Sequence, residues 1–66
     1  MTGVIKRLFK KRGFGFIKAE NGKEIFFHVT GLQNIEFDLL KEGDLVEFNI
    51  VEGAKGLRAV DIKAKK

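Results

Sequence analysis

The fold of this chain is decided by residues 12–29, which read RGFGFIKAENGKEIFFHV. Residues 14–19 and 24–29 are rich in aromatic and β-branched side chains, which favour strands. Asn21-Gly22 stands between these two apolar runs, and this dipeptide is a strong signal for a hairpin. The stretch therefore predicts two short antiparallel strands that follow one another directly.

The two faces of this predicted hairpin carry different kinds of side chain. Because side chains alternate along a strand, Ile17, Ile25 and Phe27 lie on one face. The opposite face carries Phe14, Phe16, Phe26 and His28. A small barrel has a single interior, so we predict that the first set fills it and that the second forms an exposed aromatic patch. The alternatives are that the two faces are swapped, or that a loop covers the phenylalanines as a second small core.

Three further segments complete a predicted barrel. Residues 3–10 are rich in β-forming side chains, residues 44–51 alternate between apolar and polar, and residues 57–63 give a fifth strand. The interior is then expected to include Val46, Phe48, Ile50, Val60 and Ile62. Residues 30–43 form a longer connection with room for a short helical turn. This pattern predicts an all-β fold, a five-stranded antiparallel barrel that forms a single domain over residues 1–66.

Composition excludes several classes of protein. The chain has 66 residues, no Cys and a single His, so we expect no disulfide and no metal site. No apolar run is long enough for a signal peptide or a membrane span, so we expect a cytoplasmic protein without a membrane partner. Ser is also absent, and the glycines do not match a dinucleotide or phosphate-binding loop. We therefore expect neither an enzyme nor a cofactor.

The net charge of +4 conceals an uneven distribution along the chain. Residues 1–18 carry six bases and no acid, residues 19–54 carry a net charge of −6, and residues 55–66 carry +4. The positive charge thus sits at both ends of the chain, which form one basic patch if the ends meet. Such a patch attracts phosphates, although clustered Lys and Arg can also serve solubility alone.

Aromatic platforms flanked by bases are a means of binding single-stranded nucleic acid. Every base has a π-face, so stacking tolerates sequence and contributes roughly 1–3 kcal/mol per base. An exposed patch of phenylalanines calls for an explanation, and such a ligand supplies one. Gly13 and Gly15 are expected to clear space for flat bases. The residues therefore predict binding of single-stranded RNA or DNA.

Two motifs give the chain a family resemblance. Residues 12–17 resemble the first ribonucleoprotein motif, and residues 25–29 resemble the second. Their order and spacing resemble the bacterial cold-shock domain, a relative of the Y-box domain. The resemblance continues through TGVIK at 2–6, LQ at 32–33, EG at 42–43 and GAKG at 53–56. It implies an oligonucleotide/oligosaccharide-binding (OB) barrel for single-stranded RNA and DNA. Members of this family act as RNA chaperones, and some as transcription antiterminators.

The resemblance also implies which residues contact the nucleic acid. The matching stacking positions are Phe14, Phe16, Phe26, His28 and Phe37. The matching basic positions are Lys6, Arg12 and Lys55, and Arg58 stands where the family commonly has a polar residue near the same groove. Glu24 matches an acidic residue that can hydrogen-bond a base edge. Phe37 lies in the long connection, where a core-capping role is the alternative.

Two positions depart from the family pattern. Arg7 stands where the family usually has a Trp that serves as a main stacking platform, and Val29 stands where an aromatic often follows the motif His. Arg7 can stack on a base and attract phosphate, so we include it in the site. Phe9 is a second candidate for the missing platform, but strand alternation leaves its direction open. We expect a binder that depends more on charge than typical members do, with a steeper dependence on salt.

The aromatic patch also has an alternative use. A protein-interaction module or a strand-exchanged dimer could bury the same rings, with residues 30–43 as a hinge loop. The leading interpretation is a monomer that binds single-stranded RNA and DNA.

Overall fold

The computed structural model describes residues 1–54 and 56–65, which form five strands and two short 3-10 helices. The strands are β1 (Thr2–Phe9), β2 (Phe14–Ala19), β3 (Glu24–His28), β4 (Leu45–Gly53) and β5 (Gly56–Ala64). The 3-10 helices are η1 (Val29–Gly31) and η2 (Phe37–Leu39), and both lie between β3 and β4.

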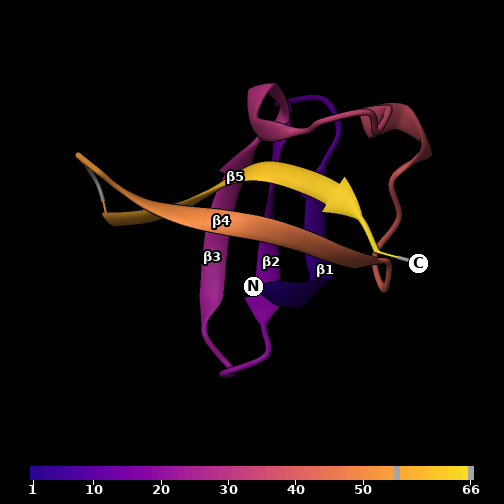
Figure 1. The fold of residues 1–66 in the computed structure, drawn as a ribbon. Coiled ribbons are helices and arrows are strands. Elements are labelled where there is room, and N and C mark those ends of the chain that lie inside the picture. The colour runs from indigo at the N-terminus through magenta and orange to yellow at the C-terminus, as the bar shows by residue number, and fades with distance from the viewer. Residues whose placement is uncertain (55, 66) are drawn as a thin grey trace.

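The strands close into a barrel with the neighbour order β1-β2-β3-β5-β4, in which β4 returns to β1 (Figure 1). The prediction of an all-β, five-stranded barrel is confirmed. Four pairings are antiparallel, but β3 pairs with β5 in parallel, unlike the fully antiparallel sheet that we predicted. The reason is geometric, because a closed ring with an odd number of strands cannot alternate direction at every neighbour.

The β2–β3 hairpin has the predicted pairing. Its cross-strand partners include Phe14 with His28, Phe16 with Phe26, and Ile17 with Ile25. In the connecting turn, the Ala19 N–H donates to the Lys23 carbonyl at 2.8 Å. Gly22 adopts a φ of 87° there, a conformation that glycine reaches without steric cost. The two strands therefore present the two faces that alternation assigned to them.

The interior of the barrel is filled by apolar side chains from all five strands and from the long connection. The buried hydrophobic residues are Ile5, Ile17, Ala19, Ile25, Phe27, Leu40, Val46, Phe48, Ala59 and Ile62. Most of the predicted interior is confirmed, and Ile50 is half-buried against the core. The prediction is wrong at Val60, because Ala59 takes the interior position on β5.

A bulge in β5 explains the error. Between the pairs Glu47–Lys63 and Asn49–Val60, β5 has two residues where β4 has one. Asp61 lies at this bulge with a φ of 52°. Because one extra residue reverses the phase of alternation, Ala59 points inward together with Ile62.

A second bulge, in β1, decides the direction of the outer half of that strand. The register of β1 with β2 skips one residue between Ile5 and Arg7, which makes Lys6 the extra residue. Beyond the bulge the alternation reverses. Leu8 therefore packs against the core, and Phe9 points to the outside.

Candidate nucleic-acid interface

Outward side chains of four strands form one continuous surface, which we call the aromatic face. Its members are Arg7, Phe9, Phe14, Phe16, Phe26, His28 and Arg58. The strand register arranges them in two rows across the sheet. The first row runs Phe9, Phe14, His28, and the second runs Arg7, Phe16, Phe26, Arg58. The first row is aromatic throughout, and the second has a guanidinium group at each end.

The four phenyl rings of the face contact each other. Phe9 and Phe14 stack with centroids 4.8 Å apart and planes inclined by 28°, and Phe14 and Phe26 lie 5.6 Å apart. Phe16 meets Phe9 and Phe14 edge-on at 6.3 Å, and Phe26 at 6.0 Å. None of these four rings is among the partly buried hydrophobic residues that pack against the core, which are Leu8, Leu32, Ile35, Phe37 and Ile50. The rings of the aromatic face therefore form a separate cluster outside the barrel.

Two cations at this surface have partners within the protein. The guanidinium carbon of Arg58 lies 5.9 Å from the Phe26 ring centroid, a cation–π contact. Lys6 reaches across β2, and its ammonium lies 2.8 Å from a Glu24 carboxylate oxygen on β3. The hydrogen bond from Lys6, and then its positive charge, lower the pKa of Glu24 below its usual value of 4.5. The carboxylate therefore stays charged and competes with a phosphate for Lys6.

His28 is anchored by the start of η1. The Thr30 N–H donates to His28 Nδ1 at 3.2 Å, and the Thr30 hydroxyl lies 3.1 Å from the same nitrogen. Because Nδ1 accepts the backbone hydrogen bond, the neutral imidazole carries its proton on Nε2. His28 thus has a ring for stacking and one N–H group for a base acceptor.

Two predicted site residues, Phe37 and Arg12, lie in connections between strands. Phe37 is half-buried on η2 and packs against the core, as the core-capping alternative expects. Lys10 donates a hydrogen bond to the Phe37 carbonyl, and its ammonium lies 5.3 Å from the centroid of that ring. Arg12 is exposed in the turn between β1 and β2. The prediction for Lys55 falls outside the described residues.

The two motif glycines have structural roles, and at Gly15 this role corrects the prediction that the residue clears space for bases. Gly15 is buried, and a Cβ there would lie 2.5 Å from the Arg7 carbonyl oxygen and 2.8 Å from the Phe27 ring. Gly13 adopts a φ of 76° in the β1–β2 turn, where its N–H donates to the Phe9 carbonyl at 2.9 Å. Close packing and turn geometry therefore explain both glycines.

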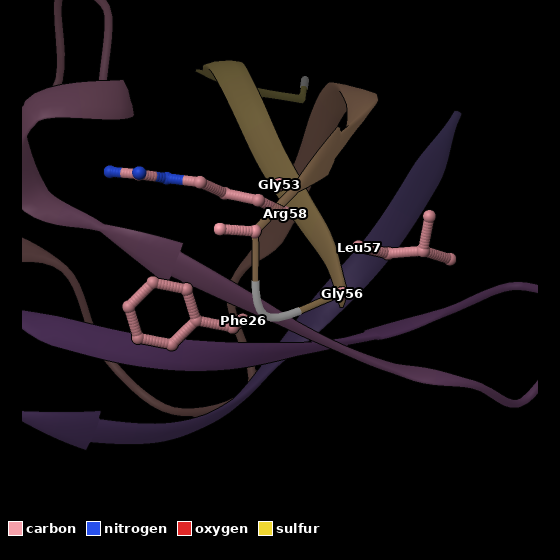
Figure 2. A pocket seen from close by; sticks show the side chains of 6 residues that line it. Phe26, Gly53, Gly56, Leu57 and Arg58 are labelled. Carbon is pink, nitrogen blue, oxygen red and sulfur yellow. The ribbon is translucent and has the colours of Figure 1, made fainter.

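A pocket of about 530 Å³ adjoins the second row where β3 meets the β4–β5 hairpin. Its described lining consists of Phe26, Gly53, Ala54, Gly56, Leu57 and Arg58. Figure 2 shows the Arg58 side chain running past the Phe26 ring, while Leu57 points away from both. Sequence reasoning missed Gly53 and Leu57 as lining residues, because the pocket exists only where two distant strands pair in parallel.

Phe9 is the member of the aromatic face that sequence reasoning could not place. Strict alternation from Ile5 points Phe9 inward, and only the bulge turns it outward. The one signal in the sequence is the consecutive pair Lys6-Arg7, because a regular strand would turn one of these two charged side chains toward the interior.

The described part of the chain contains neither a metal-binding cluster nor a membrane-spanning helix. Its His, Asp and Glu side chains form no group of three or more that could bind a metal ion. No helix within residues 1–54 and 56–65 is long and apolar enough to cross a membrane.

A closed barrel with rings and cations on one outer face defines the class of OB-type nucleic-acid-binding proteins. The family model of the 'Cold-shock' DNA-binding domain matches residues 1–65, and the chain belongs to that family. Cold-shock domains bind single-stranded nucleic acids and are not enzymes. The family resemblance and the predicted binding of nucleic acid are thereby confirmed.

Known relatives match this chain along most of its length. The cold shock-like protein CspC of Bacillus cereus is 40% identical over 62 residues, which cover 94% of this chain and 95% of that protein. The major cold shock protein of Streptococcus pyogenes is 42% identical over 60 residues, covering 91% and 90%. Among solved structures, Drosophila Unr CSD456 is similar with a TM-score of 0.72 and 28% identity. That match covers 98% of this chain and 26% of the Drosophila chain.

Proposed function

We propose that this chain binds single-stranded RNA and DNA by stacking bases on the aromatic face. It acts in the cytoplasm, as a monomer, as an RNA chaperone or a regulator of transcription or translation. The observation that carries the proposal is the cluster of four outward rings, which are not among the described residues that pack against the core. Arg7 and Arg58 stand at the two ends of its second row. Stacking on bases removes these rings from water and tolerates any base sequence.

The rings and the cations of the aromatic face have different roles in binding. The rings of Phe14, Phe16 and Phe26 supply stacking, and Arg7 and Arg58 at the ends of the second row attract phosphates. Lys6 and Arg12 add positive charge beside the rows. Because the protein binds unpaired strands and not duplexes, it shifts weak RNA hairpins toward the open form by mass action.

Titration of a short oligopyrimidine at low and at high salt tests the binding mode. The wild-type protein is expected to bind at low salt and more weakly at high salt. A variant with Phe14→Ala, Phe16→Ala and Phe26→Ala is expected to lose binding while its far-UV circular dichroism stays native, because these rings lie outside the core. Leu39→Ala is the matched control, since this apolar side chain is 69% exposed on η2 and lines a hollow together with Leu45 and Ala64.

Three results would contradict this binding mode. A folded wild-type protein that fails to bind at low salt removes the proposal. Unfolding of the triple variant shows instead that the rings serve as core. A stable dimer in sedimentation, with the face shielded, would favour the protein-interaction alternative.

A dye-labelled RNA hairpin with a weak stem tests the chaperone role separately. The wild-type protein is expected to open the hairpin, and the triple variant is expected to leave it closed. A protein that binds single strands but leaves the hairpin closed is a regulator and not a chaperone.

A further inference from the structure

We infer that Phe9 forms a base-stacking subsite of its own, at the end of the aromatic face beside the β1–β2 turn. The inference rests on the proposed function, because it adds one residue to the surface that contacts the single strand. Three observations support the inference. They are the direction of the Phe9 side chain, the contacts of its ring, and the positive charges that follow it in the chain.

The direction of Phe9 is a consequence of the β1 bulge and not of core packing. The register places Phe9 opposite Phe14, on the outer side of the sheet. The residue is 36% exposed, and it is not among the described hydrophobic residues that pack against the core. Its aromatic contacts are with Phe14 and Phe16, which belong to the same face. A large apolar side chain in this position calls for a ligand more than for a structural role.

One face of the Phe9 ring is covered by Phe14, and the residue as a whole stays 36% exposed. Phe14 covers one face, because the two rings stack at 4.8 Å with an inclination of 28°. Phe16 meets the ring edge-on. The described aromatic contacts leave the side of the ring away from Phe14 without a stacked partner, and we place the subsite there. β4 pairs with β1 over Thr2–Val4, so the described part of the sheet has no strand beside Phe9 on that side.

The neighbouring phenyl rings hold Phe9 in an orientation that allows a base to stack on it. Phe9, Phe14 and Phe26 follow one another as stacked or tilted neighbours, at 4.8 and 5.6 Å. A base placed on the side of Phe9 away from Phe14 becomes the next member of this column. Because the contacts with Phe14 and Phe16 already restrict the ring, little conformational freedom is lost on binding.

The charges next to Phe9 identify the ligand as a nucleobase of a polyanion rather than an uncharged apolar molecule. Lys10, Lys11 and Arg12 follow Phe9 directly, and all three are exposed. Lys10 is engaged with the Phe37 carbonyl. A strand whose base stacks on Phe9 therefore passes its phosphates by the exposed Lys11 and Arg12.

A Trp at position 9 gives a direct test, because the chain contains neither Trp nor Tyr. In the Phe9→Trp variant, the indole emission is expected to be quenched when an oligopyrimidine binds. The Leu39→Trp variant, on the exposed η2 side chain, is expected to keep its emission. If the oligonucleotide binds but leaves the emission of Phe9→Trp unchanged, the inference is wrong.

Phe9→Leu tests the contribution of the ring to affinity, since leucine keeps an apolar side chain but has no π-face. We expect the affinity to fall roughly 5- to 150-fold, the loss of one stacked base. Circular dichroism and the denaturation midpoint are expected to stay close to the wild type. An unchanged affinity overturns the inference and leaves the proposed function intact. Failure of the wild-type protein to bind overturns both, so the two failures are distinguishable.

Discussion

The ion pair between Lys6 and Glu24 limits how much of the positive charge near the aromatic face a phosphate can use. Both side chains are exposed, so the pair contributes little to folding, but it occupies the Lys6 ammonium. The pKa of Glu24 is lower in the folded than in the unfolded chain, because Lys6 donates to it and carries a positive charge. The pair therefore stabilises the fold above pH 4.5, and this stabilisation is lost as the pH falls through the lowered pKa of Glu24.

Removal of the Glu24 charge is therefore expected to strengthen binding of a single strand. Glu24→Gln releases Lys6 for phosphate, and we expect an affinity increase of about two- to fivefold at low salt. In the wild-type protein the same increase is expected when the pH falls through the lowered pKa, and in Glu24→Gln this pH dependence is expected to disappear. Titrations of an oligopyrimidine across that pH range measure both effects. A weaker affinity of Glu24→Gln would instead show that the carboxylate contacts the ligand.

The two bulges are the elements that set the outer surface of the barrel. The bulge at Lys6 turns Phe9 outward, and the bulge at Asp61 turns Ala59 inward. Asp61 also connects three parts of the fold. One carboxylate oxygen accepts from Gln33 Nε2 at 2.7 Å, and the other accepts from Asn49 Nδ2 at 3.2 Å. Asp is among the few residues that adopt a positive φ readily, which suits it to this position.

Asp61→Ala is expected to destabilise the fold by about 1–3 kcal/mol, because it removes two hydrogen-bond acceptors and puts a less tolerant residue at positive φ. Asparagine tolerates this φ and keeps one acceptor, so Asp61→Asn is expected to destabilise the fold less than Asp61→Ala. Urea denaturation measures the free energy of unfolding. Lys63→Ala, at an exposed neighbour on β5, is the control. Equal stability of Asp61→Ala and wild type would show that the bulge does not depend on this side chain.

At the scale of the whole molecule, the barrel brings the two basic ends of the chain together. The Lys65 ammonium lies 3.3 Å from the Thr2 hydroxyl oxygen, so the two ends meet. The aromatic face also combines both ends, because Arg7 comes from the first basic segment and Arg58 from the last. The row register places them at opposite ends of the Phe16–Phe26 pair. Charge that is far apart in the sequence therefore surrounds one set of rings.

This arrangement predicts a measurable salt dependence. Each cation that neutralises a phosphate of a single strand contributes about −0.7 to the slope of log affinity against log salt concentration. Arg7→Gln is expected to make the slope less steep by about 0.7, because it removes one charge from the face. Lys63→Ala, which removes a charge outside the face, is expected to leave the slope unchanged. If both variants change the slope equally, the binding depends on net charge and not on the aromatic face.

Much of this protein could be predicted from the sequence because the decisive signals are local. The Asn21-Gly22 turn and the alternation in residues 14–19 and 24–29 depend only on neighbours in the chain. They predicted the hairpin, its two faces and the outward position of Phe14, Phe16 and Phe26. The order of the motifs was enough to identify the family.

Only the tertiary structure decided the features that depend on pairing between strands. Alternation gives the direction of a side chain only while the register is regular, and a bulge reverses it. The sequence therefore misplaced Val60, left Phe9 open and did not reveal that Gly15 is required by contact with Phe27. The parallel pairing of β3 with β5 follows from closing an odd number of strands, which no single strand encodes. Local chemistry thus determined which residues form the strands, and long-range pairing decided which of them reach the aromatic face.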